Sequence, residues 1–374
     1  MPTRADNEAV SLVVGGKLHS NWSRYDIDSD LMKAADGWTF ELFTGGEALP
    51  DSVQEGAPME VHVGRERVMV GFIDDIVETD SRENLSVSLT GRDLVGQLLD
   101  CSAPIFAANQ VTLENIIKQA ALPLGIKRYR IEAEHMQRHD RVAIDPGVSA
   151  WDAVREAAEV AGLWPWLEPD GTLVVGGPDY TRPPVATLIL SRSQPDKNNV
   201  ISISRTRSMA DRASEITVLA QGHGTGQAEG QHAIKAKVRD RGVSLYRPRI
   251  VTCGDADNAE MANNYARKLQ ADSRLNGLTL QVEVPGHRTE GGQLWKPGQR
   301  VVLQWETKGV HGVFFLVQRK LLGGRGQARH TQLTLKEDGV WQVFAIPQDK
   351  RGGKRKGRKK KATGPGEIVD VERY

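Results

Sequence analysis

Residues 111–125 read VTLENIIKQAALPLG, and residues 148–162 read VSAWDAVREAAEVAG. Both fit one pattern, V-[ST]-x-x-[ND]-x-hydrophobic-x-x-A-A-x-x-x-G. In each copy a Thr or Ser precedes apolar residues at helical spacing, and a Gly closes the pattern, which is typical of a helix with an N-cap and a left-handed end. The pattern predicts two similar short helices that begin after Thr112 and Ser149. A chance similarity of two short amphipathic helices is the alternative interpretation.

Strand-like sequence follows each of these helices. KRYRIEAE (127–134) alternates polar and apolar residues, and WPWLEPDGTLVVGGP (164–178) indicates a hairpin with its turn at Pro169-Asp170-Gly171. A short helix cannot bury its apolar face alone. We therefore expect the two helices to pack on each other or on a shared sheet, within a small α+β unit.

The regions on both sides of this unit are rich in alternating strands. GWTFELFTG (37–45) and LSVSLTG (85–91) are examples before it, and LTLQVEVPG (278–286) and RVVLQWET (300–307) are examples after it. Short alternating runs with Gly-bearing turns predict antiparallel barrels or sandwiches. A clear helix, with Met261, Tyr265 and Leu269 on one face, is predicted over 257–273.

The predicted fold class is therefore α+β, mainly β, with four parts. A first β-barrel domain occupies 1–102, and the α+β insertion occupies 103–185. A second β-barrel domain occupies 186–349, with an inserted loop and helix at about 222–275. A basic tail follows over 350–374, and we expect it to be disordered at least through Gly366 because it is polar and highly charged.

The composition is that of a soluble globular protein. The 374 residues are 39% hydrophobic and 26% charged. The sequence has no apolar run of membrane-spanning length, and MPTRADNEAVSL at the N-terminus lacks the apolar core of a signal peptide. We therefore expect no membrane anchor. Two cysteines, Cys101 and Cys253, are too few for a disulfide framework and fit a reducing cytosol, although a bridge between them is the minor alternative.

The sequence contains no convincing catalytic constellation. His135 and His139 are four residues apart, but Met136 stands where a zinc protease needs Glu, and no third ligand is evident. Asp74 and Asp75 are adjacent in a predicted strand and should point to opposite faces, so they cannot share a proton. No phosphate-binding loop or nucleophile motif is present. We therefore predict no catalytic residue, cofactor or metal, and a protein that functions through its surfaces.

The basic tail is the strongest electrostatic feature. Residues 350–374 carry ten basic and three acidic side chains, whereas the whole chain has a net charge of only +1. The tail could bind nucleic acid through phosphate charge, dock on an acidic protein surface, or simply be solvated. No aromatic residues are interleaved for base stacking. The residues with this candidate electrostatic role are Lys354, Arg355, Lys356, Arg358, Lys359, Lys360 and Lys361.

Four segments, in order and spacing, resemble the baseplate hub proteins of contractile phage tails, especially the Mu-like group, which is related to the hub part of type VI secretion spike proteins. They are GRDLVGQLLDCSAP (91–104), VSAWDAVREAAEVAGLWPWLEPDGTLVVGGP (148–178), RPRIV (247–251) and GGQLWKPGQRVVLQ (291–304). The resemblance covers most of residues 9–345 and leaves the basic tail unmatched.

The resemblance implies a structural virion protein with two barrels related to the tail-tube subunit. Three chains would form a homotrimer with six similar barrels in a ring, which joins the hexameric tail tube protein to the trimeric central spike protein. Distal tail, tape-measure and baseplate wedge proteins are further candidate partners, and genome DNA could pass through the lumen. The location would be the phage tail baseplate, assembled in the bacterial host cytoplasm. Trp38, Trp151 and Trp295 are expected to matter for packing or contact.

Three other functions stay open from the sequence. A tail-associated hydrolase could cut peptidoglycan, although no residue nominates a catalytic centre. A nucleic-acid-binding protein could act through the basic tail. A secretion-system spike protein could share the hub fold. The sequence does not decide whether the tail is contractile.

Overall fold

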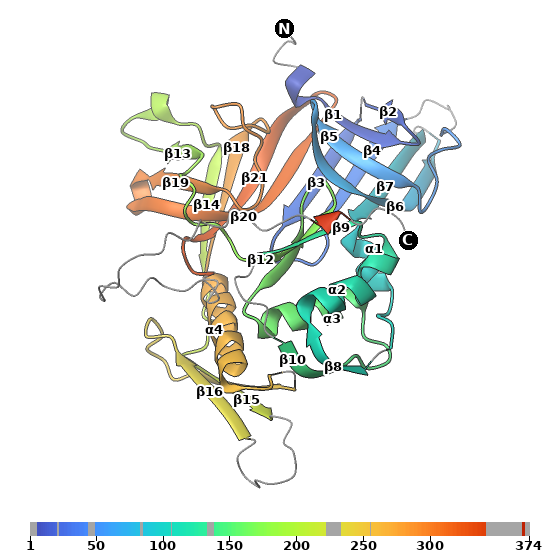
Figure 1. Cartoon of the computed structure of the whole chain (residues 1–374). Helices are drawn as coiled ribbons and strands as arrows, with labels where there is room; N and C mark the ends of the chain where they lie inside the picture. Colours follow the sequence, from blue (N-terminus) through green and yellow to red (C-terminus); the bar gives the residue numbers. More distant parts are fainter. Residues whose placement is uncertain are drawn as a thin grey trace, which may run out of the picture.

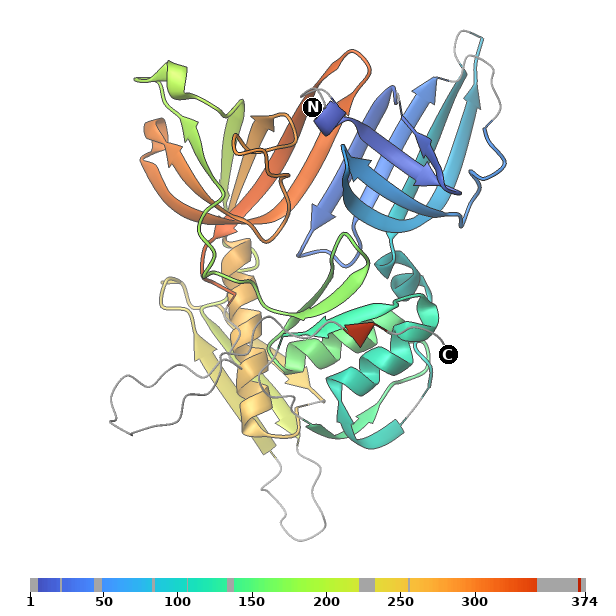
Figure 2. The same cartoon turned by 45° about the horizontal axis from the view of Figure 1, so that its top comes forward.

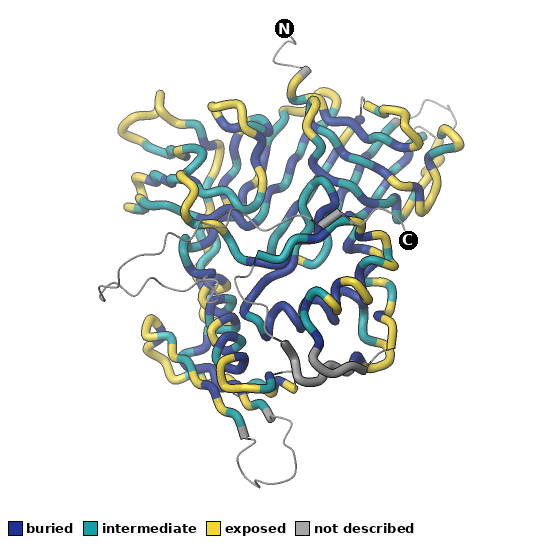
Figure 3. The backbone as a smooth tube through the Cα atoms, viewed as in Figure 1, coloured by how far each residue is buried: buried dark blue, intermediate teal, exposed yellow. Residues whose placement is uncertain are grey.

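The structure, a computed structural model, describes most of the chain. It covers residues 6–20, 22–43, 49–82, 85–105, 107–132, 138–221, 233–254, 256–341 and 369–370. Two strand-rich modules lie side by side, and the helices lie below them in Figures 1 and 2. Figure 3 shows that buried residues follow the strands and helices, whereas exposed residues gather at the outer loops.

The first β module follows a short 3₁₀ turn, η1 (Asp6–Glu8). Its strands are β1 (Val10–Val14), β2 (Lys17–His19), β3 (Arg24–Asp30), β4 (Gly37–Phe43), β5 (Pro58–Val63), β6 (Glu66–Asp80) and β7 (Leu85–Asp93). They pair in the order β3-β4-β7-β6-β5-β1-β2. Residues alternate between buried and partly exposed, so one face of the sheet covers an apolar core that contains Leu12, Ile27 and Phe40.

The second β module is built from the end of the chain and from strands before it. Its strands are β13 (Ala186–Leu190), β14 (Ser202–Arg207), β18 (Leu278–Pro285), β19 (Arg300–Trp305), β20 (Val310–Gly324) and β21 (Gln327–Glu337), with 3₁₀ turns η3 (Pro195–Lys197) and η4 (Glu306–Lys308) between them. They pair in the order β14-β18-β21-β20-β19-β13. Leu303, Leu316 and Leu333 are fully buried in the core of this module.

The two modules repeat one topology. Taken in chain order, the six strands β1, β3, β4, β5, β6 and β7 occupy the same places in the first sheet as β13, β14, β18, β19, β20 and β21 in the second. The one difference in direction is at the edge, where β1 is antiparallel to β5 but β13 is parallel to β19. The α+β, mainly β fold class is confirmed, with two like β regions. Among the described strands the order is an open path, so strand pairing does not close either module.

The unit that contains the two similar helices lies between the modules in the sequence and below them in Figure 1. Its elements are α1 (Val95–Asp100), β8 (Ala107–Thr112), α2 (Leu113–Ala120), η2 (Leu122–Leu124), β9 (Arg128–Ile131), β10 (Arg138–Ala143), α3 (Ala150–Val160), β11 (Trp164–Leu167) and β12 (Thr172–Gly176). The predicted N-caps are confirmed, since Thr112 and Ser149 each accept a hydrogen bond from the backbone N–H three residues on. The helices share one core, and β9 and β11 flank β12 in one sheet.

Two local predictions in this unit need correction. The helical spacing of Leu94, Val95, Leu98 and Leu99 in RDLVGQLLD (92–100) predicts a helix over this stretch. The helix begins only at Val95, because Arg92 and Asp93 are still paired with β4 and β6 as the end of β7. Gly125 (φ 97°) ends the turn η2 rather than α2. The cause is Pro123, which has no N–H to continue the helix. Gly162 (φ 76°) follows α3 as predicted.

A second inserted unit lies between β14 and β18. It consists of β15 (Glu215–Gln221), β16 (Ala233–Arg239), β17 (Pro248–Cys253) and α4 (Ala259–Asn276). The sequence places β15 in the second barrel, but β15 pairs with β16 and β17 in a separate sheet. Its alternation fits either sheet equally well. Met261, Tyr265 and Leu269 of α4 pack on this sheet, as their spacing predicts.

The basic tail is largely outside the described residues. Two of its residues, Val369 and Asp370, form β22, which pairs with β9 (Figure 1). These two residues lie beyond Gly366, so the expectation of disorder through Gly366 falls on residues outside the described part of the chain. The seven basic residues proposed for electrostatic contact lie outside the part of the chain that the structure describes.

Candidate assembly interface

One strand, β20, joins the two modules because it changes partner along its length. Residues 310–315 pair with β19, and residues 318–323 pair antiparallel with β3 of the first module. The change occurs at a bulge between Leu316 and Gln318. A bulge bends a strand and increases its twist; beyond it, β20 stays paired with β21 along one edge while its other edge meets β3 instead of β19. We call the β20–β3 pairing the seam.

An ion pair and a hydrogen bond line one face of the seam. The Lys320 ammonium lies 2.7 Å from Asp26 Oδ2. Gln318 Nε2 donates to Asp28 Oδ1 at 2.8 Å. Both acceptors are on β3, so polar side chains of β20 meet acidic side chains of the first module. Partly exposed pairs of this kind contribute less to stability than to the choice of partner.

The opposite face of the seam is buried. Leu321 lies across from Ile27, and both side chains are fully buried in the core of the first module. Two residues before Leu321, Arg319 Nη2 donates to Ser29 Oγ at 2.5 Å. Burial lowers the pKa of Arg319 to about 10, although the charge of Asp36 acts in the opposite direction. A leucine of one module thus completes the core of the other.

A buried hydrogen-bond chain also connects the modules. Tyr25 Oη lies 2.8 Å from Nε2 of His287, and His287 Nδ1 lies 3.1 Å from Thr331 Oγ1. Burial raises the pKa of Tyr25 to about 12 and lowers the pKa of His287 to about 3. Both groups are therefore neutral at physiological pH, and the chain acts as a structural connection without net charge.

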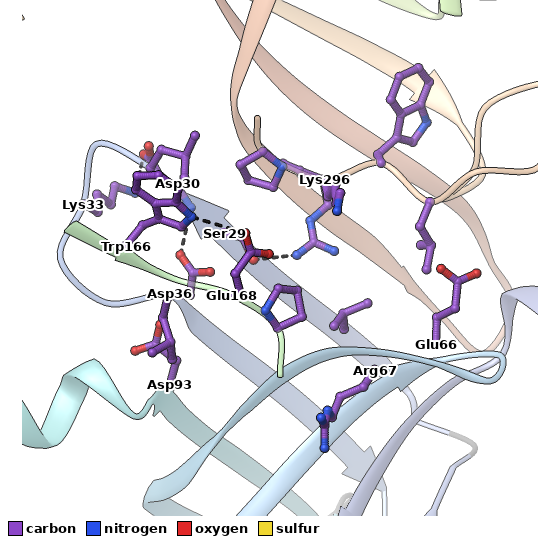
Figure 4. Close-up of a pocket in the computed structure, with 18 of the residues that line it drawn as sticks. Ser29, Asp30, Lys33, Asp36, Glu66, Arg67, Asp93, Trp166, Glu168 and Lys296 are labelled. Carbon is purple, nitrogen blue, oxygen red and sulfur yellow. Dashed lines mark hydrogen bonds and ion pairs between the residues drawn. The ribbon is translucent and has the colours of Figure 1, made fainter. Parts of the chain in front are cut away.

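A cavity of about 180 Å³ lies between both modules and the β11–β12 hairpin (Figure 4). Asp36 and Asp93 contribute to its lining, and burial raises the pKa of both carboxyls, that of Asp36 to about 6. Each carboxyl is engaged by the backbone: Asp36 accepts from the N–H of Asp30 at 2.8 Å, and Asp93 accepts from the N–H of Val95 at 2.9 Å. These contacts fix the turn before β4 and the start of α1, which is a structural role.

The catalytic constellations weighed from the sequence do not assemble. Asp74 accepts from Arg92 Nε at 2.7 Å, whereas Asp75 accepts from Thr90 Oγ1 at 3.3 Å, so the two carboxylates have separate partners, as expected. His135 lies outside the described residues, and of His139 only the backbone, in β10, is described.

Other functional groups give no site either. Cys101 and Cys253 are not joined by a disulfide. Among the residues described, no three His, Cys, Asp or Glu side chains gather as a metal site needs. Within the same residues, no helix is long and apolar enough to span a membrane.

Trp38, Trp151 and Trp295 are buried, one in each of three cores, which gives them packing roles.

β6 is the counterpart of β20 and has its own bulge at the equivalent place, between Ile73 and Asp75. Residues 66–72 pair with β5. Beyond the bulge, residues 75–80 pair with β7 along one edge, and no described strand lies along the other edge. These residues are exposed apart from the half-buried Ile76.

β14 is the counterpart of β3, and it pairs with β18 alone among the described strands. Residues 75–80 of β6 and residues 202–207 of β14 are called the two free edges below. They are the counterparts of the two strands that form the seam. The strands β2 and β13 also end the strand order, but neither corresponds to a strand of the seam. An unpaired edge offers its N–H and C=O groups to another strand.

The sequence interpretation did not find the free edges. The signal that could have located them is the similarity of VGFIDD (70–75) to VFFLVQ (313–318), two segments that carry the bulges at the same position. A second signal is Leu-Thr at 89–90 and again at 333–334, in the strands that pair with these segments.

Four family models match successive parts of the chain. Residues 9–93 match the N-terminal domain of the Mu phage baseplate assembly protein GpP-like family, and residues 95–177 match the second domain of baseplate hub protein gp44-like proteins. Residues 212–270 match the third domain of NMB1110-like tail proteins, and residues 272–340 match the C-terminal domain of the same group.

Individual relatives agree with these matches. A tail protein from Neisseria meningitidis MC58 is 39% identical, with a TM-score of 0.77, over 89% of this chain and 97% of that chain. The baseplate hub protein gp44 of Escherichia phage Mu is 23% identical over 330 residues, 84% of each chain. The 43 kDa tail protein of prophage MuSo2 from Shewanella oneidensis, 23% identical over 88% of this chain and 98% of that chain, shares the fold with a TM-score of 0.74.

The repeated β module, the seam and the ordered domain matches together define a component of a phage tail. The chain belongs to the family of Mu-like baseplate hub proteins. The recognition made from four sequence segments is thereby confirmed.

Proposed function

We propose that three copies of this chain form the hub ring of a phage tail baseplate. One face of the ring joins the hexameric tail tube protein, and the other face joins the trimeric central spike protein. Distal tail, tape-measure and baseplate wedge proteins are the other candidate neighbours. The chain assembles in the host cytoplasm and ends in the virion, and genome DNA passes through the lumen of the ring.

The repeated strand order is the observation that carries this proposal. A tube of six subunits and a spike of three subunits differ in symmetry, so their junction needs a part compatible with both. A chain with two like β modules supplies it, because three chains present six modules while keeping a threefold axis. The baseplate hub assignment of the Mu relative points to the same place in the virion.

The proposed mechanism is adhesive and mechanical rather than enzymatic. A ring that must survive ejection needs obligate interfaces, which typically bury more than about 2,000 Å². The buried face of the seam gives the joint between two modules the character of a continuous core. The seven basic tail residues, Lys354 to Lys361, would add an electrostatic contact with an acidic neighbour or with the DNA.

Deleting this chain from its phage genome tests the proposal. We expect particles without complete tails and a loss of plaque-forming units of several orders of magnitude, because the tube has no platform from which to grow. Supplying the wild-type chain in trans should restore both. Complete tails of normal infectivity in the deletion strain would refute the hub function.

A further inference from the structure

We infer that the two free edges pair with each other between copies, so that residues 75–80 of β6 in one copy lie antiparallel to β14 of the next. This inference rests on the proposed ring and specifies its contact. The seam shows how one strand of this type, β20, pairs with one strand of the other type, β3. β6 and β14 are their counterparts, and both are unpaired on the relevant edge within the described structure.

The register of this contact follows from the bulges. In β20 the first paired residue after the bulge is Gln318, and in β6 it is Asp75. Counting three residues on from each makes Leu321 equivalent to Glu78. The two strands therefore have a common numbering from their bulges outward.

The equivalent positions of β3 and β14 follow from the ladders. In the first module, Asp75 of β6 pairs with Thr90 of β7. Thr90 pairs with Thr39 of β4, and Thr39 pairs with Asp26 of β3. In the second module, Gln318 of β20 pairs with Thr334 of β21. Thr334 pairs with Gln281 of β18, and Gln281 pairs with Ser204 of β14. Asp26 and Ser204 are thus equivalent, as are the residues that follow them.

The central pair of the seam, Leu321 and Ile27, is apolar and fully buried. At the equivalent positions the free edges carry Glu78 and Arg205. The apolar pair of the seam therefore corresponds to a pair of opposite charges in the inferred contact between copies. Directly opposite residues of antiparallel strands have Cβ atoms about 4.5–5.5 Å apart, which brings an Arg and a Glu within ion-pair distance. In the part of the chain that is described, neither side chain forms an ion pair.

Neighbouring positions reinforce this pairing. The register places Asp80 opposite Ile203, one step along the same face from Arg205. It places Arg207 opposite Ile76, one step from Glu78. Glu78 thus has Arg205 directly opposite and Arg207 on the diagonal, and Arg205 has Glu78 directly opposite and Asp80 on the diagonal, at the distances over which cross-strand neighbours interact.

The charges also select the order of modules around the ring. Pairing of β20 with β14 of another copy would place Leu321 opposite Arg205, and pairing of β6 with β3 would place Glu78 opposite Ile27. Each wrong combination would remove a charge from water without a partner, which costs several kcal/mol. Of these combinations, only the pairing of β6 with β14 gives both Glu78 and Arg205 an oppositely charged partner. The contact is head-to-tail, and such a contact closes into a ring when the rotation from one copy to the next divides a full turn, as a threefold axis requires.

Charge reversal tests the inference, with the purified full chain and its molar mass from light scattering over a range of concentrations. Glu78→Arg alone and Arg205→Glu alone should each raise the concentration for half-assembly by about 100-fold or more, as like charges directly opposite each other oppose association. The combined Glu78→Arg, Arg205→Glu variant should return to within about tenfold of the wild type. Glu55→Arg, an equal charge change at an exposed turn, should have no effect.

A disulfide measurement checks the register independently of charge. Val77 and Thr206 lie opposite each other in the inferred pairing, so Val77→Cys with Thr206→Cys should give covalent oligomers under mild oxidation. Val77→Cys with Ile201→Cys should not, because five strand residues separate the second position by about 17 Å.

Three outcomes would overturn the inference. If the wild type assembles but single reversals assemble equally well, or if the double variant is no better than the singles, the contact lies elsewhere while the ring stands. If the second cysteine pair cross-links instead of the first, the register is wrong. If the wild type stays monomeric at every concentration, both the contact and the proposed ring are refuted.

Discussion

Replacing Leu321 by alanine is expected to lower the free energy of unfolding by about 2–5 kcal/mol, the range for a fully buried leucine. Leu321 belongs to β20 of the second module but is fully buried in the core of the first, across from Ile27. The substitution removes apolar contacts and leaves a cavity at the joint between modules. Urea unfolding followed by tryptophan fluorescence measures the change.

Leu322 provides a matched control for this experiment. It is the next residue of the same strand, but it is only partly buried and lies on the opposite face, across from Asp26. Leu322→Ala should cost less than about 1 kcal/mol. Equal losses for the two variants would mean that the seam is not a shared core, and the account of how the modules are joined would then be wrong.

Replacing Lys268 by methionine is expected to cost about 3–5 kcal/mol, because it removes the buried cation that Glu159 and Asp272 share and leaves the largely buried Glu159 with only the more distant Arg155. The Lys268 ammonium lies 2.6 Å from Glu159 Oε1 and 2.7 Å from Asp272 Oδ2, and the side chain is only 7% exposed. Glu159 belongs to α3 and Lys268 to α4. The ion pair therefore fastens the second inserted unit to the unit with the paired helices.

A double-mutant cycle separates the ion pair from packing. The combined Lys268→Met, Glu159→Leu variant should recover most of the stability, since buried ion pairs can be replaced by apolar pairs at little cost. Lys308→Met, at an exposed position, should change the free energy of unfolding by less than about 0.5 kcal/mol. A fully additive cycle would show that the two side chains do not interact.

Local features of this fold could be predicted because local residues determine them. Thr112 and Ser149 are good N-caps in any context, and the spacing of Met261, Tyr265 and Leu269 requires a helical face. Alternation likewise identified the strands of both modules. These signals depend on residues within one turn or one hairpin, so they need no knowledge of the rest of the chain.

The partners of the strands could not be predicted in the same way. β15 alternates like a strand of the second module, yet its partners are β16 and β17. β20 pairs with β3, about 290 residues away, after a bulge that no local propensity specifies. Whether a position such as Glu78 lies at a core, a surface or an interface depends on such pairings. The free edges therefore became visible only when the two modules could be compared strand by strand.

A projection of the assembled particle along its symmetry axis, obtained by electron microscopy of the purified chain, shows directly whether three chains form a ring of six β modules. A ring of three chains with two like β modules each should show six lobes of similar size around an open centre, with threefold symmetry relating alternate lobes. A solitary particle, or a ring whose number of lobes is not six, would contradict this arrangement.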